Sequence, residues 1–119
     1  MNAVDQLASA LPKFGPFPDR ARLFHDRIQA ALEFLGWQTR REVDVQALRL
    51  GNGRCGRVDL VATREGASVA IELDRMSPRS RSLRKLSLMP VAERLVILRR
   101  RAPLHRVEGV AVFGLEVSP

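Results

Sequence analysis

Two short apolar segments joined by a two-residue turn constrain the fold of this chain more than any other feature. Residues 56–61 read GRVDLV and residues 69–74 read VAIELD, with the turn-forming pair Glu65-Gly66 between them. A hairpin closed by this pair has a fixed register, because the loop length determines which residues face each other. In that register Asp59 lies directly opposite Glu72 on the neighbouring strand.

The alternation of side chains along the two strands gives the hairpin one apolar face and one polar face. The apolar face is predicted to consist of Val58, Leu60, Ala62, Val69, Ile71 and Leu73. The opposite face is predicted to carry Arg57, Asp59, Val61, Ala70, Glu72 and Asp74. Two carboxylates that face each other destabilise a sheet, so the pair requires a compensating cation, and a divalent metal with oxygen ligands is the usual one.

The other segments predict an α/β fold. Apolar positions recur at helical spacing from Asp19, a candidate N-cap, to Leu35, before the helix-ending Gly36. Ser77-Pro78 is typical of a helix start, and that helix is expected to end before Pro90. The remaining predicted elements are a short helix at 2–11, an extended segment at 37–50, a turn at 51–53, and strands at 95–98 and 110–117. This order favours a small mixed β-sheet with flanking helices.

The length of 119 residues indicates one domain. We expect an N-terminal helix and Pro-rich loop at 1–18, followed by a single domain at 19–119. The one cysteine, Cys55, excludes an internal disulfide and a Cys-based zinc site. No signal-peptide pattern or membrane-spanning apolar run is present, so the expectation is a cytoplasmic protein with no membrane partner.

The positive charge of the chain is concentrated in its second half. Residues 1–74 carry ten basic and ten acidic side chains, whereas residues 75–106 carry ten basic side chains and Glu93 alone as an acid. A nucleic acid is the partner that this asymmetry favours, although arginines can also simply solvate a surface. The candidate nucleic-acid contacts are Arg79, Arg81, Arg84, Arg99, Arg100 and Arg101.

The order of elements and acids resembles the restriction-endonuclease-like PD-(D/E)XK nuclease superfamily. The resemblance runs from about Asp19 to Arg100, and the motif acids correspond to Asp59, preceded here by Val58 instead of proline, and Glu72. It implies a restriction-endonuclease-like fold and an endonuclease that hydrolyses phosphodiester bonds, with DNA favoured over RNA. The implied cofactor is Mg²⁺ or Mn²⁺, held by the two acids and the main-chain carbonyl of Leu73.

The chain departs from the family at one important position. The family has a lysine two residues after the second acid, and Asp74 stands there. One explanation is that the lysine has moved to the following helix as Lys85, close enough to stabilise charge near an attacking water. A second is that Asp74 is itself a metal ligand. A third is that the site is inactive and that Asp74 pairs with Arg57 across the hairpin.

Four other residues bear on the site. Some family members add an acid from the first helix, and Glu33 is the candidate, with Glu42 as second choice; a surface ion pair is the alternative for both. His25 is interpreted as an ordinary side chain on a helix flank, and Cys55 as a small buried or half-buried residue.

The resulting hypothesis is a metal-dependent nuclease with Asp59, Glu72 and Lys85 in its catalytic site. The alternative is a catalytically inactive nucleic-acid-binding module on the same fold. A basic structural protein of a ribonucleoprotein would explain the charge but not the acidic pair. Because related folds often use two sites to cut a duplex, a homodimer is compatible with the resemblance.

Overall fold

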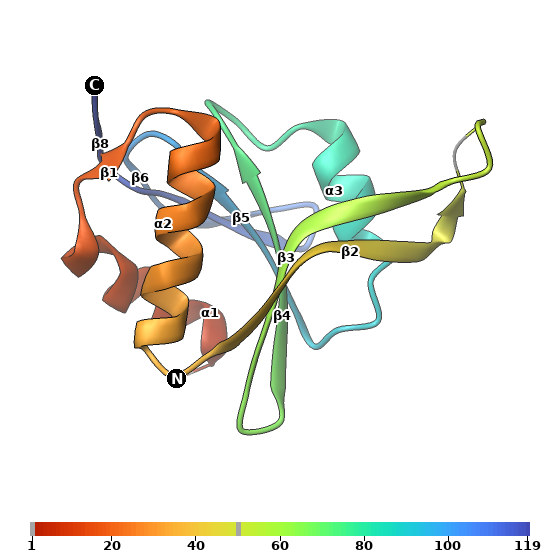
Figure 1. Ribbon diagram of the computed structural model, residues 1–119, viewed down its shortest axis with the longest axis horizontal. Coiled ribbons are helices and arrows are strands. Elements are labelled where there is room, and N and C mark those ends of the chain that lie inside the picture. The colour runs from red at the N-terminus through yellow and green to blue at the C-terminus, as the bar shows by residue number, and fades with distance from the viewer. Residues whose placement is uncertain (1, 50) are drawn as a thin grey trace.

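A six-stranded mixed sheet separates two layers of helices in the computed structural model, which describes residues 2–49 and 51–119 (Figure 1). The strand order is β2-β3-β4-β5-β7-β6; β4, β5 and β7 run parallel, and the other neighbours are antiparallel. The strands are β2 (Gln38–Arg49), β3 (Cys55–Arg64), β4 (Ala67–Asp74), β5 (Glu93–Leu98), β6 (Ala102–Val107) and β7 (Val110–Gly114). The predicted α/β class, a mixed sheet with flanking helices, is confirmed.

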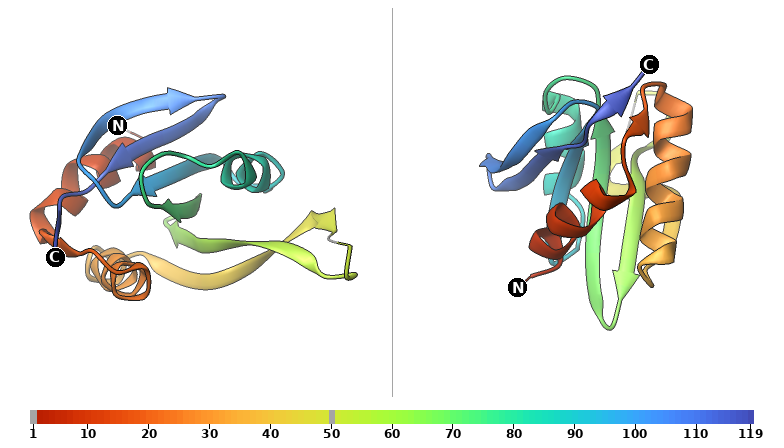
Figure 2. Two further views of the ribbon diagram at one scale, coloured as in Figure 1. Left: turned by 90° about the horizontal axis from the view of Figure 1, so that it is seen from above. Right: turned by 90° about the vertical axis from the view of Figure 1, so that its left-hand side faces the viewer.

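The helices cover the two faces of the sheet unequally (Figure 2). One face is covered by α1 (Ala3–Ala10), the 3-10 helix η1 (Leu11–Phe14) and α2 (Ala21–Phe34), and the other by α3 (Ser80–Ser87). The short strands β1 (Phe17–Pro18) and β8 (Val117–Ser118) pair with each other near the C-terminus. None of the helices in the described parts of the chain is long and apolar enough to cross a membrane.

The N-terminal segment is part of the main core. Leu7, Leu11 and Phe17 are fully or almost fully buried in the same apolar cluster as Phe24 and Ile28 of α2. Removing this segment would therefore expose the face of the sheet that α1 and η1 cover.

The central strand β5 shows how the sheet is buried on both sides. Leu95 and Ile97 belong to the core under α1 and α2, whereas Val96 and Leu98 belong to the core under α3. All four side chains are fully buried. The apolar run 95–98 is typical of a strand in the middle of a sheet covered on both faces, which is where β5 lies.

The β3–β4 hairpin has the predicted register. Its pairs run from Arg64 opposite Ala67 to Leu60 opposite Ile71. Beyond Leu60 the strand β3 leaves β4 and continues in contact with β2 alone, and the β2–β3 ribbon swings away toward the side of α3 (Figure 1). The predicted position of Val58 on the same face as Leu60 is wrong: because the ribbon bends between them, Val58 packs in the core under α3.

Glu42 marks the bend on the other strand of the ribbon. It lies between the pairs Arg41–Leu60 and Val43–Val58, and its φ of 54° is in the left-handed region. A non-glycine residue adopts this conformation in mid-strand only where the surrounding structure enforces it. The residues beyond it, 43–49 and 51–57, form the far end of the β2–β3 ribbon.

Several predicted boundaries differ from the structure. Arg20, not Asp19, is the N-cap of α2, and Asp19 instead contacts Arg99. Helix α3 begins at Ser80 rather than at Ser77, because the amide of Arg79 binds the carboxylate of Asp74. Leu50, the predicted end of the extended segment, lies outside the described residues.

The C-terminal third contains two more strands than predicted. The predicted strand at 110–117 is divided into β7 and β8. Strand β6 was not predicted, because it is an exposed edge strand that contains Pro103 and basic residues and has no apolar period.

Candidate active site

Asp59 and Glu72 meet where β3 separates from β4. The amide of Asp59 donates a hydrogen bond to Glu72 Oε2 at 2.8 Å, and the amide of Leu73 donates one to Asp59 Oδ2 at 2.8 Å. These two bonds replace the main-chain pairing that would continue the hairpin beyond Leu60. The fork in the sheet therefore brings the two carboxylates together, while β3 stays paired with β2 and β4 with β5.

The pKa of Glu72 is strongly shifted. Its side chain is 1% exposed, and burial is the main reason that its pKa is raised from 4.5 to about 7. The charge of Asp59 raises the pKa further, and the ammonium of Lys85 opposes both effects. Glu72 therefore exchanges a proton near neutral pH, an unusual property for a structural glutamate.

Lys85 reaches this pair from α3. Its Nζ atom lies 2.5 Å from Glu72 Oε1 and donates a hydrogen bond to the carbonyl of Arg57 at 2.8 Å. The side chain passes beside Gly56, where a β-carbon would lie 3.7 Å from Lys85 Cδ and 2.7 Å from Leu48. The ammonium has three N–H groups, so one remains without a partner among the described residues.

Asp74 has a different set of partners. Its carboxylate accepts hydrogen bonds from the amide and Nε of Arg79 and from Ser82 Oγ, so it caps the start of α3. The pairing of Arg57 with Asp74 that belonged to the third explanation is wrong, because the bend in β3 carries Arg57 to Asp44 on β2, at 3.2 Å. By anchoring α3, Asp74 fixes the helix that presents Lys85.

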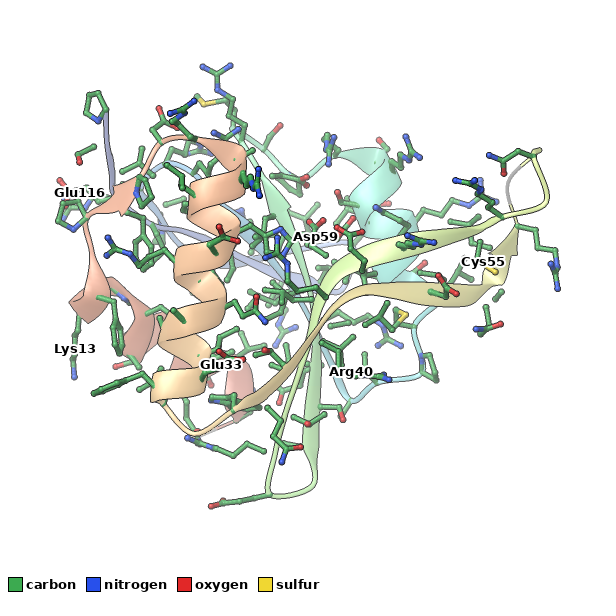
Figure 3. The ribbon with its side chains drawn as sticks, in the orientation of Figure 1. Lys13, Glu33, Arg40, Cys55, Asp59 and Glu116 are labelled. Atoms are coloured by element: carbon green, nitrogen blue, oxygen red, sulfur yellow. The ribbon has the colours of Figure 1, made fainter. Side chains whose placement is uncertain are left out.

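The two candidate additional acids are placed differently. Glu33 accepts a hydrogen bond from Thr39 at 2.8 Å and lies toward the far end of α2 from Asp59 (Figure 3). Glu42 occupies the bend opposite Asp59 and is exposed. Of the two, Glu42 is next to the acidic pair and Glu33 is not.

The interpretation of His25 as an ordinary flank residue missed its position beside Asp59. Its side chain is buried, and Nε2 has no hydrogen-bond partner among the described residues. Burial is the main reason that its pKa is lowered below 6.5; Arg41 lowers it further, whereas the carboxylates of Asp59 and Glu42 and the Asp59 main chain raise it. A neutral imidazole with one free nitrogen therefore lies next to the acids at pH 7.

A signal for His25 was present in the sequence. His25, Ile28 and Leu32 share one helical face, and the last two are core residues. A polar side chain in the apolar stripe of a helix is costly to bury, which distinguishes it from a residue on a solvated flank.

The candidate nucleic-acid contacts fall into two groups. Arg79, Arg99 and Arg100 bind the protein itself, through Asp74, Asp19 and the carbonyl of Met76. The side chains of Arg81, Arg84 and Arg101 are exposed and make no hydrogen bond or ion pair with the described residues. Arg81 and Arg84 lie one turn apart on α3, and Arg81 is four residues before Lys85, so these cations share one side of the helix.

The acidic pair is suited to a hard cation only if other ligands complete the site. No group of three or more His, Cys, Asp and Glu side chains arranged to hold a metal ion is found within residues 2–49 and 51–119. Glu72 Oε1 is buried and contacts the ammonium of Lys85. Since Mg²⁺ commonly uses one or two carboxylates together with waters and substrate phosphates, the donor set fits such an ion.

Comparison of the chain with protein-family models, curated proteins and solved structures finds no match.

Proposed function

We propose that this protein is a metal-dependent nuclease of the restriction-endonuclease-like PD-(D/E)XK type, acting on DNA in preference to RNA. Asp59, Glu72 and the carbonyl of Leu73 would hold Mg²⁺ or Mn²⁺, with the neutral imidazole of His25 close by. The bound ion would supply Lewis-acid stabilisation of the phosphate and lower the pKa of an attacking water.

The observation that carries this proposal is the position of Lys85. An active site of this kind needs a cation near the attacking water, and Asp74 cannot provide one. The Lys85 ammonium lies 2.5 Å from Glu72 Oε1 and has one N–H group left to donate. It is thus the group that takes the role of the missing motif lysine.

The basic side chains support a phosphate polymer as the substrate. Arg81 and Arg84 on α3 and Arg101 after β5 are exposed cations without partners among the described residues. Such side chains bind phosphates without distinguishing sequences. We therefore assign binding of the nucleic-acid phosphate backbone to these arginines and hydrolysis to the acidic pair.

A second candidate function has an observation of its own in its favour. The carboxylate oxygens at the fork bind the amides of Asp59 and Leu73 and the ammonium of Lys85, so much of the network is satisfied by the protein. A network of this kind can simply stabilise the bent hairpin. In that case the protein is a nucleic-acid-binding module without hydrolytic activity.

Cleavage assays separate the two functions. Wild-type protein should cleave linear duplex DNA in the presence of Mg²⁺ or Mn²⁺, and Asp59→Asn should abolish cleavage because it removes a metal-binding charge. Glu116→Gln is the matched control, since Glu116 is exposed and lies at the edge of the molecule, away from Asp59 (Figure 3). DNA binding without cleavage with either metal would favour the inactive module, and equal effects of the two substitutions would contradict the site.

A further inference from the structure

The loop between β4 and α3 contains an exposed apolar side chain, Met76, between arginines. It reads Arg75-Met76-Ser77-Pro78-Arg79, and the side chain of Met76 leaves that residue 57% exposed. Arg75 is exposed before it, and Arg79 after it binds Asp74 through Nε while its side chain stays 63% exposed. Exposed apolar residues are common singly, but this one is part of a strongly basic loop at the end of the strand that carries Glu72.

The main chain of this loop is held firmly. Arg100 Nε donates to the carbonyl of Met76, and the amide of Arg99 donates to the carbonyls of Asp74 and Arg75. The amide of Arg79 binds Asp74 Oδ2 at 3.0 Å. The exposure of Met76 is therefore imposed by hydrogen bonds on both sides and is not that of a loose loop tip.

The loop is close to the acidic pair. Met76 follows Glu72 by four residues, which span at most about 14 Å of extended chain. The path from β4 to α3 also runs along the end of the sheet where α2 begins (Figure 1). Stacked bases are about 3.4 Å apart along a strand, so Met76 lies within about four base steps of the fork.

We propose that Met76 inserts between neighbouring bases of a bound nucleic acid and unstacks them close to the phosphate at the acidic pair. This inference rests on the proposed function. An apolar wedge flanked by cations is the combination that proteins use to kink a duplex, because the cations bind phosphates on both sides of the opened step. The flexible, polarisable thioether suits a contact with the faces of bases.

A fluorescent base analogue tests this proposal. Short DNA duplexes carry 2-aminopurine at successive positions, and they are mixed with Asp59→Asn protein so that no cleavage occurs. Unstacking should raise the fluorescence several-fold at one or two adjacent positions. Combining Met76→Ala with Asp59→Asn should abolish the rise in fluorescence. Combining Met76→Leu with Asp59→Asn keeps a large apolar side chain at this position and should retain most of the rise.

Leu88→Ala is the matched control, because Leu88 is also apolar and is 37% exposed at the end of α3. It should leave the fluorescence rise unchanged. Binding is followed by anisotropy in the same samples. Binding with no fluorescence rise at any position, or an undiminished rise with Met76→Ala, would overturn the wedge alone, whereas no binding to any duplex would overturn the proposed function together with it.

Discussion

Lys85 and Glu72 form a buried ion pair, with 2.5 Å between Nζ and Oε1 and with 13% and 1% of the two side chains exposed. The pair does not keep Glu72 fully ionised at neutral pH. Burial and the charge of Asp59 outweigh the ammonium and raise the pKa of Glu72 to about 7. The sign of this shift determines how the stability of the fold and the affinity for a metal ion depend on pH.

The first dependence concerns stability. Since the folded-state pKa of Glu72, about 7, lies above its ordinary value of 4.5, the folded state holds a proton between these values that the unfolded state lacks. The resulting stabilisation is complete below pH 4.5 and is lost as the pH rises through 7, a change of about 3 kcal/mol in the free energy of unfolding. Urea unfolding at several pH values should show this decrease, and Glu72→Gln should flatten it. Parallel pH profiles for the two proteins would contradict the assignment.

The second dependence concerns metal binding. A divalent ion between Asp59 and Glu72 competes with the proton on Glu72, so its affinity should increase with pH up to about 7 and then level off. Calorimetric titration with Mg²⁺ or Mn²⁺ in buffers of different ionisation enthalpy should show release of nearly one proton per ion at pH 6. Proton uptake on binding, or an affinity that does not change between pH 5.5 and 7.5, would argue against this site.

Gly114 should tolerate no side chain. A β-carbon there would lie 1.8 Å from the carbonyl oxygen of Arg100, a main-chain atom that cannot move aside cheaply. Gly114→Ala should lower the free energy of unfolding by more than about 3 kcal/mol or prevent folding. Gly51→Ala is the control, because nothing lies within 4 Å of a β-carbon at that position. Thermal unfolding compares the two variants, and a similar melting temperature for both would show that the close approach is absent.

Nucleic-acid binding should weaken steeply with salt. The logarithm of the association constant should fall with the logarithm of salt concentration by about 0.9 for each duplex phosphate contacted. Arg84→Ala should reduce the magnitude of this slope by about 0.9, the value for one phosphate contact. Lys13→Ala removes the same charge from an exposed position far from Asp59 and should leave the slope unchanged (Figure 3). An unchanged slope for Arg84→Ala would mean that this arginine only solvates α3.

The parts of the fold that sequence predicts well are those set by local chemistry. The turn Glu65-Gly66 and the alternation on both sides of it determine the hairpin register, and the register in turn brings Asp59 to Glu72. The apolar run of β5 likewise indicates its central position. In each case neighbouring residues carry the information.

The parts that sequence did not predict depend on contacts between distant residues. Glu93, which stood out only as the single acid of a basic segment, binds the amides of Ala3 and Val4 at the start of α1, at 3.1 and 3.0 Å. The capping of α3 by Asp74 and the position of His25 beside Asp59 have the same origin. The sequence pattern contains no information on the distance between residues that are far apart along the chain. The partners of such residues are therefore known only from the folded structure.

The bend in the hairpin is the most consequential of these features. It moves Arg57 away from Asp74 and opens the fork at which the acids meet. Regular alternation predicts a straight strand through Val58 and Leu60, and the left-handed conformation of Glu42 departs from any β-strand expectation. Sequence patterns describe regular elements and miss such a departure, which here coincides with the candidate site.

The most direct test of the central claim is the rate of DNA cleavage by Lys85→Ala under single-turnover conditions, compared with Lys13→Ala, the only other lysine substitution that the chain allows. If Lys85 acts mainly in the transition state, its loss should lower the cleavage rate about 10²-fold or more while DNA and metal affinities change little. Lys13→Ala should cleave like wild type. A Lys85→Ala protein that cleaves at the wild-type rate, or that loses rate only in proportion to DNA affinity, would contradict the claim that Lys85 replaces the motif lysine.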